Sequence, residues 1–182
     1  MTTTWNIDAA HSAITFSIRH MVFSKVRGRF LNYTGAIRLD DDDQSRSWVE
    51  LTIDAASIDT GNPQRDTHLR SADFFDVETF PELRFRSTRV EPTGNERVRV
   101  IGELTIHNVT REVVLDAEHA GRGMDPWGNE RIGFVAKTSI DRKEFGLAWN
   151  QLLEAGGVLV GDRVDIDLDV QAVNTAARDA AA

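Results

Sequence analysis

The chain has 182 residues, 41% of them hydrophobic, with a formal net charge of −8 and no cysteine. This composition suits a single globular domain with a substantial core and is unlike that of a disordered chain. The negative charge argues against nucleic acid, or an anionic membrane, as the main partner because both repel it at long range. The absence of cysteine excludes disulfides and thiolate metal sites.

The N-terminal residues have neither a basic start nor an apolar run, so no secretion signal is expected. No stretch of the sequence approaches the ~18 to 20 apolar residues that a membrane helix needs. We therefore expect a cytoplasmic protein with no integral membrane association.

Most of the chain alternates between apolar and polar residues with a period of two, which is typical of strands with one buried face. In the first such segment, Ile14, Phe16, Ile18 and His20 share a face. Similar segments follow at residues 29–39, 48–55, 83–88, 98–106, 113–119, 132–142 and 164–171. Turn-forming runs separate several of them, such as residues 40–43 and 121–128.

Two segments interrupt the alternation. In residues 62–71, Pro63 suits a first helical turn and Asn62 a helix cap, which predicts a short helix. Phe74 and Phe75 follow it, and we expect them to plug or roof the barrel end. In residues 145–157, the spacing of Trp149, Leu152 and Leu153 suggests a second short helix near a barrel mouth.

About eight long strands, each with one apolar face, must bury that face either against a second sheet or by closing into a barrel. Closure gives a barrel with room for side chains or one small ligand. We favour an all-β, eight-stranded antiparallel lipocalin-like barrel with one or two short inserted helices over a sandwich, because sandwich strands are usually shorter. The barrel domain is expected to span residues 1–173, with residues 174–182 as a flexible tail.

Several sequence blocks occur in a distinctive order between Trp5 and Val173. They are Asp8-Ala9-Ala10-His11-Ser12, Gly28-Arg29-Phe30, residues 65–76 (RDTHLRSADFFD), residues 102–106 (GELTI), Arg142-Lys143-Glu144-Phe145-Gly146 and Asp162-Arg163-Val164. In order and spacing they resemble the YceI-like family of lipocalin-like polyisoprenoid-binding proteins. The family often has glycine where Asn108 stands, and asparagine tolerates the same left-handed turn geometry.

The resemblance implies an eight-stranded barrel with an inserted helix and a long apolar tunnel. It implies a polyisoprenoid or isoprenoid-quinone lipid as ligand, a non-catalytic role in binding, storage or transport, and no cofactor. Many relatives carry a secretion signal and act in the periplasm, whereas the present N-terminus leads us to expect the cytoplasm. A homodimer is consistent with the resemblance.

A prenyl tail gains roughly 0.8 kcal/mol for each methylene removed from water, whereas one polar contact nets about 0.5 to 1.5 kcal/mol. The tail should therefore dominate affinity and the head group should set orientation. For each candidate tail contact, plain core packing is the alternative. The candidates are Ile14, Phe16, Ile18, Leu51, Ile53, Phe74, Phe85, Val100, Leu104, Leu115, Phe134, Ile140, Ile166 and Leu168.

Three polar residues lie in phase with apolar inward positions: His20, His119 and Arg142. An inward charge must be paired or meet a polar ligand, so these are the candidate head-group contacts. The alternatives are a structural ion pair for Arg142 and structural hydrogen bonds for the two histidines.

Catalysis is a rival class, because the chain has five histidines and many acids. The sequence has no His-Glu-x-x-His or Gly-x-Ser-x-Gly motif. His107 and His119 fall on opposite strand phases, which weakens a shared metal site. We expect no enzyme activity and no metal; the remaining alternatives are a histidine-dependent enzyme and a stress-related interaction module with a collapsed cavity.

Overall fold

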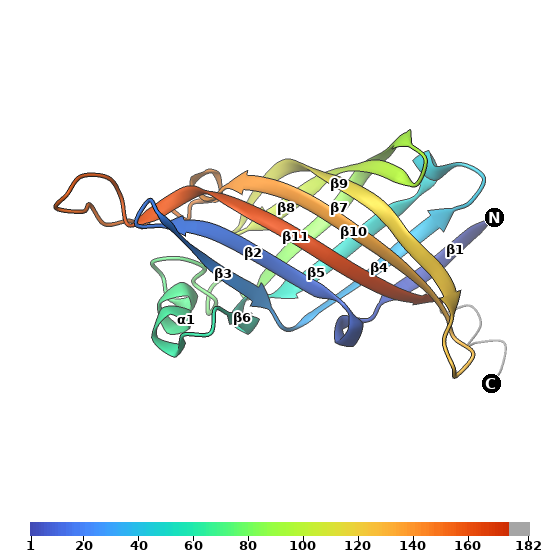
Figure 1. The fold of residues 1–182 in the computed structure, drawn as a ribbon, viewed down its shortest axis with the longest axis horizontal. Helices are drawn as coiled ribbons and strands as arrows, with labels where there is room; N and C mark the ends of the chain where they lie inside the picture. The colour runs from blue at the N-terminus through green and yellow to red at the C-terminus, as the bar shows by residue number, and fades with distance from the viewer. Residues whose placement is uncertain (175–182) are drawn as a thin grey trace.

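The computed structural model describes residues 1–174, which form an elongated antiparallel barrel (Figure 1). The strands are β1 (Thr2–Ile7), β2 (Ala13–His20), β3 (Ser24–Phe30), β4 (Tyr33–Asp40), β5 (Trp48–Asp54), β6 (Ile58–Asp59), β7 (Glu82–Gly94), β8 (Arg97–Ile106), β9 (Val109–Met124), β10 (Glu130–Asp141) and β11 (Val160–Asn174). The helices are α1 (Pro63–Arg70) and the one-turn 3-10 helices η1 (Ala9–His11), η2 (Gln44–Arg46), η3 (Ala55–Ser57) and η4 (Arg142–Phe145).

The sheet closes on itself through β11. The strand order β1-β4-β5-β7-β8-β9-β10-β11, with β11 paired back to β1, makes a ring of eight strands. β11 pairs with β2 between Val160 and Asp169 and with β1 from Ala172 to Asn174, so β1 and β2 act as one interrupted strand. β3 continues into β4 and β5 into β6 in the same manner, which confirms the predicted eight-stranded antiparallel barrel.

The interruptions are built by local side-chain hydrogen bonds. Asp8 caps η1 by accepting a bond from the Ala10 N–H at 3.1 Å, and the Ser12 hydroxyl donates back to the Asp8 carbonyl at 2.7 Å. The sequence pattern assigned no strand to β1, whose three consecutive threonines leave Trp5 as its one buried residue. Strand β11 extends one residue beyond the expected domain end, and residues 175–182 of the expected tail lie outside the described residues.

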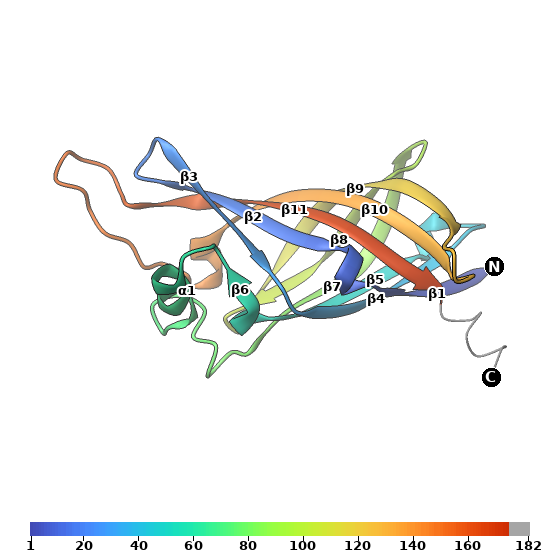
Figure 2. The same ribbon diagram turned by 60° about the horizontal axis from the view of Figure 1, so that its bottom comes forward.

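The predicted helix is present as α1. The Asn62 side chain accepts a hydrogen bond from the Arg65 N–H at 3.1 Å, and Pro63 occupies the first turn. The buried Asp66 fixes the entry by accepting bonds from the N–H and hydroxyl of Thr60 at 2.9 and 2.6 Å. α1 lies across the end of the barrel beside β6 (Figure 2), and Phe74 and Phe75 turn inward there as expected.

The prediction of a second short helix in residues 145–157 is wrong. Only η4 forms in this region, and Gly146, with φ of +77°, ends it. Residues 146–159 are an irregular loop closed by a single bridge between Leu152 and Val158. Leu152 is 82% exposed whereas Trp149 and Leu153 are half-buried, so the three side chains do not share the single buried face that a packed helix would need.

Arg142 holds both ends of that loop. Its guanidinium is 3% exposed and donates to the carbonyls of Leu147, Trp149, Gly161 and, at 3.4 Å, Val160. Burial lowers the pKa of this guanidinium, and the nearby Asp162 opposes that shift. Four of the five N–H groups of the guanidinium are used in this way.

At the opposite end of the barrel, Arg131 on β10 joins three elements. It donates to Asp125 in the β9–β10 turn at 2.8 Å, to Asp8 before η1 at 2.7 Å and to Gln171 on β11 at 2.7 Å. Arg131 lowers the pKa of Asp8. Burial would raise the pKa of Asp125, but Arg131, Asn129 and backbone N–H donors hold it well below its usual range.

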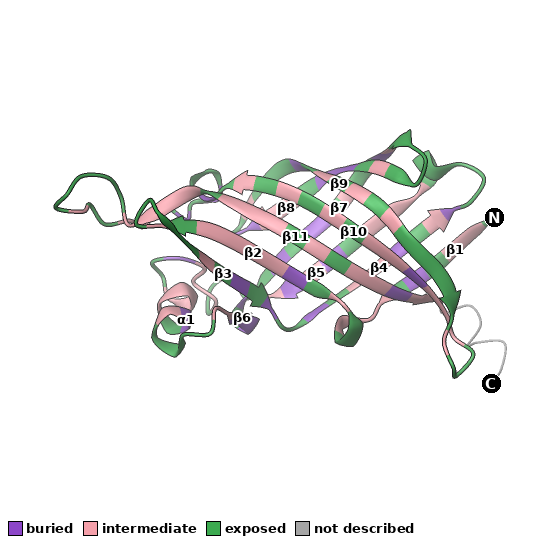
Figure 3. Cartoon of the chain, in the orientation of Figure 1, coloured by how far each residue is buried: buried purple, intermediate pink, exposed green. Residues whose placement is uncertain are grey.

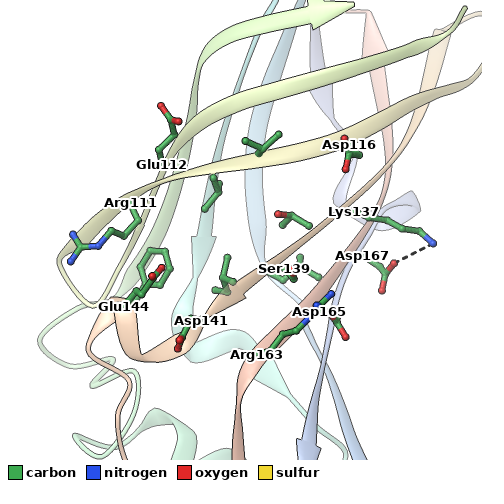
Figure 4. A pocket seen from close by; sticks show the side chains of 16 residues that line it. Arg111, Glu112, Asp116, Lys137, Ser139, Asp141, Glu144, Arg163, Asp165 and Asp167 are labelled. Atoms are coloured by element: carbon green, nitrogen blue, oxygen red, sulfur yellow. Dashed lines mark hydrogen bonds and ion pairs between the residues drawn. The ribbon is translucent and has the colours of Figure 1, made fainter. Parts of the chain in front are cut away.

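The barrel wall has a seam between β9 and β10. Pairing between β9 and β10 ends at Asp116 and Lys137, and the two strands then diverge toward η4. Between them lies an outer groove of about 700 Å³ lined mainly by charged side chains (Figure 4). Phe145 of η4, 1% exposed, packs at the base of this groove.

Buried and exposed residues alternate along the strands, as the period-two pattern predicted (Figure 3). Several inward residues, such as Phe16 and Leu115, are nevertheless only half-buried, although they pack against the main core cluster. This is the burial expected of side chains that face a hollow. None of the helices in residues 1–174 is long and apolar enough to cross a membrane.

Arg142→Met should lower the free energy of unfolding by at least about 3 kcal/mol, because several carbonyls lose a buried charged donor at about 1–3 kcal/mol each. Urea unfolding measures this. Arg163→Met is the control, since Arg163 is 75% exposed in its pair with Asp165 and an exposed pair contributes about 0–1 kcal/mol. Equal losses in the two variants would contradict the role of Arg142.

Acid should weaken the Arg131 network. The folded pKa values of Asp8 and Asp125 lie below those of the unfolded chain, so their stabilisation is present above about pH 4 and is lost as the pH falls through the lowered folded values. Urea unfolding across this range should show a steeper acid loss for the native chain than for Arg131→Gln. Parallel curves would contradict this assignment.

Candidate functional site: the barrel interior

The interior holds two cavities in tandem. One of about 520 Å³ lies toward the α1 end, and one of about 310 Å³ lies toward the opposite end, where β1 begins and β11 ends. Five side chains line both cavities and form their common waist: Ile14, Leu51, Phe85, Leu115 and Leu168. They come from five different strands, so five of the eight strands of the ring contribute to the waist. Cavities of this size suit small-molecule ligands.

Every residue expected to contact a ligand tail lines at least one cavity. The larger cavity takes the waist residues and Phe16, Ile18, Ile53, Phe74, Leu104, Ile140 and Ile166. The smaller cavity takes the waist residues, Val100 and Phe134. The collapsed interior considered as an alternative does not fit these two hollows, and contact of each residue with a ligand stays a prediction.

Sequence reasoning missed part of the lining. Leu83 and Ile106 lie within the predicted strands, in phase with Phe85 and Leu104, but were not among the selected candidates. Phe30 was missed because the pattern predicts one strand over residues 29–39, whereas β3 ends at Phe30 and β4 begins at Tyr33. Leu147, Trp149 and Leu159 come from the irregular loop and line the larger cavity. No periodic signal marks a loop, so Leu147 and Leu159 could not have been found from the pattern, although the spacing of Trp149 did suggest a position near a barrel mouth.

Glycines keep the interior open by accepting aromatic rings against the wall. Gly28 on β3 faces Phe16 on β2, and a Cβ atom at position 28 would lie 2.4 Å from the ring of Phe16. A Cβ atom at Gly102 would likewise lie 2.5 Å from the ring of Phe85. Each ring occupies the space of the missing side chain, so it lies along the wall instead of filling the hollow.

Polar groups gather where the larger cavity meets α1. Asn62, Gln64, Arg65 and His68 line it from the helix, and Arg19 and His20 from β2. The His68 ring lies against Phe74 and Trp149, with centroids 5.1 and 4.6 Å apart, and its Nε2 is 2.8 Å from Asp73. This rim combines aromatic faces with hydrogen-bond donors.

The three predicted head-group residues do not form one site. His20 and Arg142 line the larger cavity, whereas His119 lines the smaller one. The His119 ring packs against Phe134 at 5.5 Å, and its Nδ1 is 3.9 Å from Glu96. Arg142 has one N–H left after its backbone bonds, so it can donate at most one bond to a ligand.

The rim of the smaller cavity is acidic. Asp40, Asp41 and Glu96 line it together with Arg122. Burial would raise the pKa of Asp40, but the backbone N–H groups of Asp43 and Asp42 and the charge of Arg46 lower it, so this carboxylate stays charged. Within residues 1–174, the structure brings together no three His, Asp or Glu side chains that could hold a metal ion.

Relatives in sequence share most of the chain. A UPF0312 protein of Vibrio cholerae is 37% identical over 164 residues, which cover 90% of this chain and 82% of that protein. A UPF0312 protein of Serratia proteamaculans is 43% identical over 137 residues, which cover 75% and 71% of the two chains.

Solved structures show the same barrel. The Campylobacter jejuni YCEI protein matches with a TM-score of 0.70 and 30% identity, over 86% of this chain and 89% of that one. Burkholderia cenocepacia BcnA matches with a TM-score of 0.80 and 24% identity, over 91% and 98% of the chains. A polyisoprenoid binding domain from Saccharophagus degradans matches with a TM-score of 0.68 and 17% identity, over 94% and 99%, and so shares the fold.

The family model of the YceI-like domain matches residues 5–172, from within β1 to within β11, the first and last strands of the ring in the chain. With that span, the eight-stranded closure and the tandem cavities behind it, this chain belongs to the YceI-like family.

Proposed function

We propose that the chain binds one long apolar ligand, of the polyisoprenoid or isoprenoid-quinone class, along the barrel interior, and that it stores or carries this ligand without transforming it. The observation that carries the proposal is the pair of cavities joined at a common apolar waist. A tail that passes the waist removes apolar surface from water in both chambers, at roughly 0.8 kcal/mol for each methylene.

The polar rims suggest an orientation for the ligand. Quinone oxygens and phosphates accept hydrogen bonds, and the α1 end supplies donors from Arg65, His68 and His20. The other end carries the carboxylates of Asp40, Asp41 and Glu96, which disfavour an anionic or acceptor head group. We therefore propose that the head group lies at the α1 end and that the tail passes the waist. In this orientation Arg142 is part of the wall of the larger cavity, and His119 lies beside the end of the tail in the smaller cavity.

The choice of ligand class draws on relatives. The Saccharophagus degradans domain with the same fold is described as polyisoprenoid binding, which names the first compounds to test. The cytoplasmic location, the lack of catalysis and the homodimer expected from the sequence stay predictions.

Organic extraction of the purified chain, followed by mass spectrometry, should release a prenyl lipid or quinone in near-stoichiometric amount. The measurement needs no guess about the head group. An empty extract, together with no thermal shift when geranylgeraniol or a long-chain quinone is added, would overturn the proposal.

Gly28→Ala should selectively weaken long ligands. The new methyl group would meet the end of the Phe16 ring at 2.4 Å and the Thr60 methyl at 2.9 Å, so the ring must swing into the larger cavity. If that leaves about two methylenes of a long prenol in water, the affinity for geranylgeraniol falls about tenfold. Affinity for the shorter geraniol should change much less.

Gly94→Ala is the matched control for this change, because a Cβ atom at position 94 meets no other atom within 4 Å. Fluorescence displacement with both prenols compares the two variants. Equal weakening of both prenols by Gly28→Ala, or no weakening of either, would show that the ligand does not pass Phe16.

A further inference from the structure

Exposed apolar side chains gather at one end of the molecule. Met21, Val22 and Phe23 form the β2–β3 turn, and Phe23 is 81% exposed. Leu152 (82% exposed) and Val158 (37%) project from the loop before β11. We call these five residues the apolar tip. In Figures 1 and 2 the turn and the loop both project beyond the barrel wall at the α1 end.

The two parts of the apolar tip are in contact. The Met21 N–H donates to the Leu159 carbonyl at 2.9 Å, and a Cβ atom built on Gly157 would lie 3.4 Å from a methyl group of Val22. They therefore form one patch. Leu159, Val160 and Arg19, which adjoin the tip in sequence, also line the larger cavity, so the patch lies at the rim of its mouth.

Folding alone does not account for the residues in this turn. Met21 and Val22 have φ of +52° and +69°, the left-handed region that hairpin turns normally fill with glycine or asparagine. A β-branched residue is costly there. Bulky apolar residues thus occupy positions where small polar residues would stabilise the free protein better.

The charge next to the tip is opposite to that of the whole chain. Residues 9–39 contain no Asp or Glu, and their cations are Arg19, Lys25, Arg27, Arg29 and Arg38, although the chain as a whole carries −8. Arg19 and Lys25 stand directly opposite each other on β2 and β3, an unfavourable pairing of like charges. Within residues 1–174, Lys25 and Arg27 form no ion pair. The loop part of the tip carries one acidic residue, Glu154, against the three cations Arg19, Lys25 and Arg27. The surroundings of the tip therefore keep a net positive charge that complements an anionic surface.

We propose that the apolar tip docks the α1 end of the barrel on an anionic lipid bilayer. Phe23 and Leu152 enter the boundary between head groups and acyl chains, and Arg19, Lys25 and Arg27 contact the lipid phosphates. The acidic remainder of the chain is repelled by the same surface, and this repulsion orients the molecule with its α1 end toward the bilayer. This docking rests on the proposed function, because its role is to bring the cavity mouth to the bilayer in which prenyl lipids reside.

Co-sedimentation with vesicles tests the docking. The native chain should bind vesicles of phosphatidylcholine and phosphatidylglycerol, and bind phosphatidylcholine alone at least about tenfold more weakly, because cationic residues near a bilayer add affinity for anionic lipid. The double variant Phe23→Ser with Leu152→Ser should lose at least about tenfold in binding, the change expected when large apolar side chains no longer leave water.

Trp127→Ser is the matched control, since Trp127 is also 81% exposed but lies in the β9–β10 turn at the other end. It should bind vesicles like the native chain. Equal loss in Trp127→Ser and the double variant, or no binding of the native chain to either vesicle, would overturn the docking. A native dimer that the double variant converts to a monomer would also overturn it, because a second copy would then cover the tip.

Prenol binding without vesicles separates the two proposals. The double variant should bind geranylgeraniol in solution within about twofold of the native chain, because none of its changed side chains lines a cavity. In the native chain, prenol binding without vesicle binding overturns docking and leaves the proposed function standing. Vesicle binding without prenol binding does the reverse.

Discussion

This molecule depends on one constraint: the ring of strands closes around an interior that the protein's side chains do not fill. Closure is achieved by β11, which pairs with β1 over its last three residues, Ala172 to Asn174, and with β2 between Val160 and Asp169. The bend capped by Asp8 between these two strands lets one long wall element change direction without leaving the ring. All inward faces then point to a common axis, and ring closure leaves room for one ligand.

The interior stays hollow because of where its large aromatic side chains lie. Phe16 and Phe85 are large enough to cross the interior, but each lies over a glycine of the neighbouring strand. The waist is therefore made by side chains from five strands, with none filling the axis alone. Two glycine positions thus let residues that look like an ordinary core in sequence line two cavities.

Period-two alternation predicted the barrel, its antiparallel strands and the inward set, because each strand has one dry face. The cap and first turn of α1 were readable for the same local reason, since Asn62 and Pro63 act within one helical turn. The left-handed turn at Asn108, with φ of +58°, also follows from the residue itself. Features that arise from neighbouring residues were thus accessible from sequence.

Features that arise from distant partners were not. Alternation put Arg142 in phase with Ile140, but this residue lies in η4. Its guanidinium N–H groups donate to backbone carbonyls in and next to a loop that has no periodic pattern. His20 and His119 are equivalent in alternation, but they lie in different cavities. Strand β1 was missed because its pairing with β4 and β11, and not its own sequence pattern, makes it a strand.

The seam between β9 and β10 has a consequence for self-association. Unpaired strand edges are templates for adding a strand from another chain, and they promote aggregation unless they are protected. Here the divergent edges are flanked by acidic and basic side chains, including Arg111, Glu112, Asp141 and Glu144, and Phe145 blocks the groove from below. An incoming strand would have to strip water from these charges, so the barrel can stay open at this point without recruiting copies of itself.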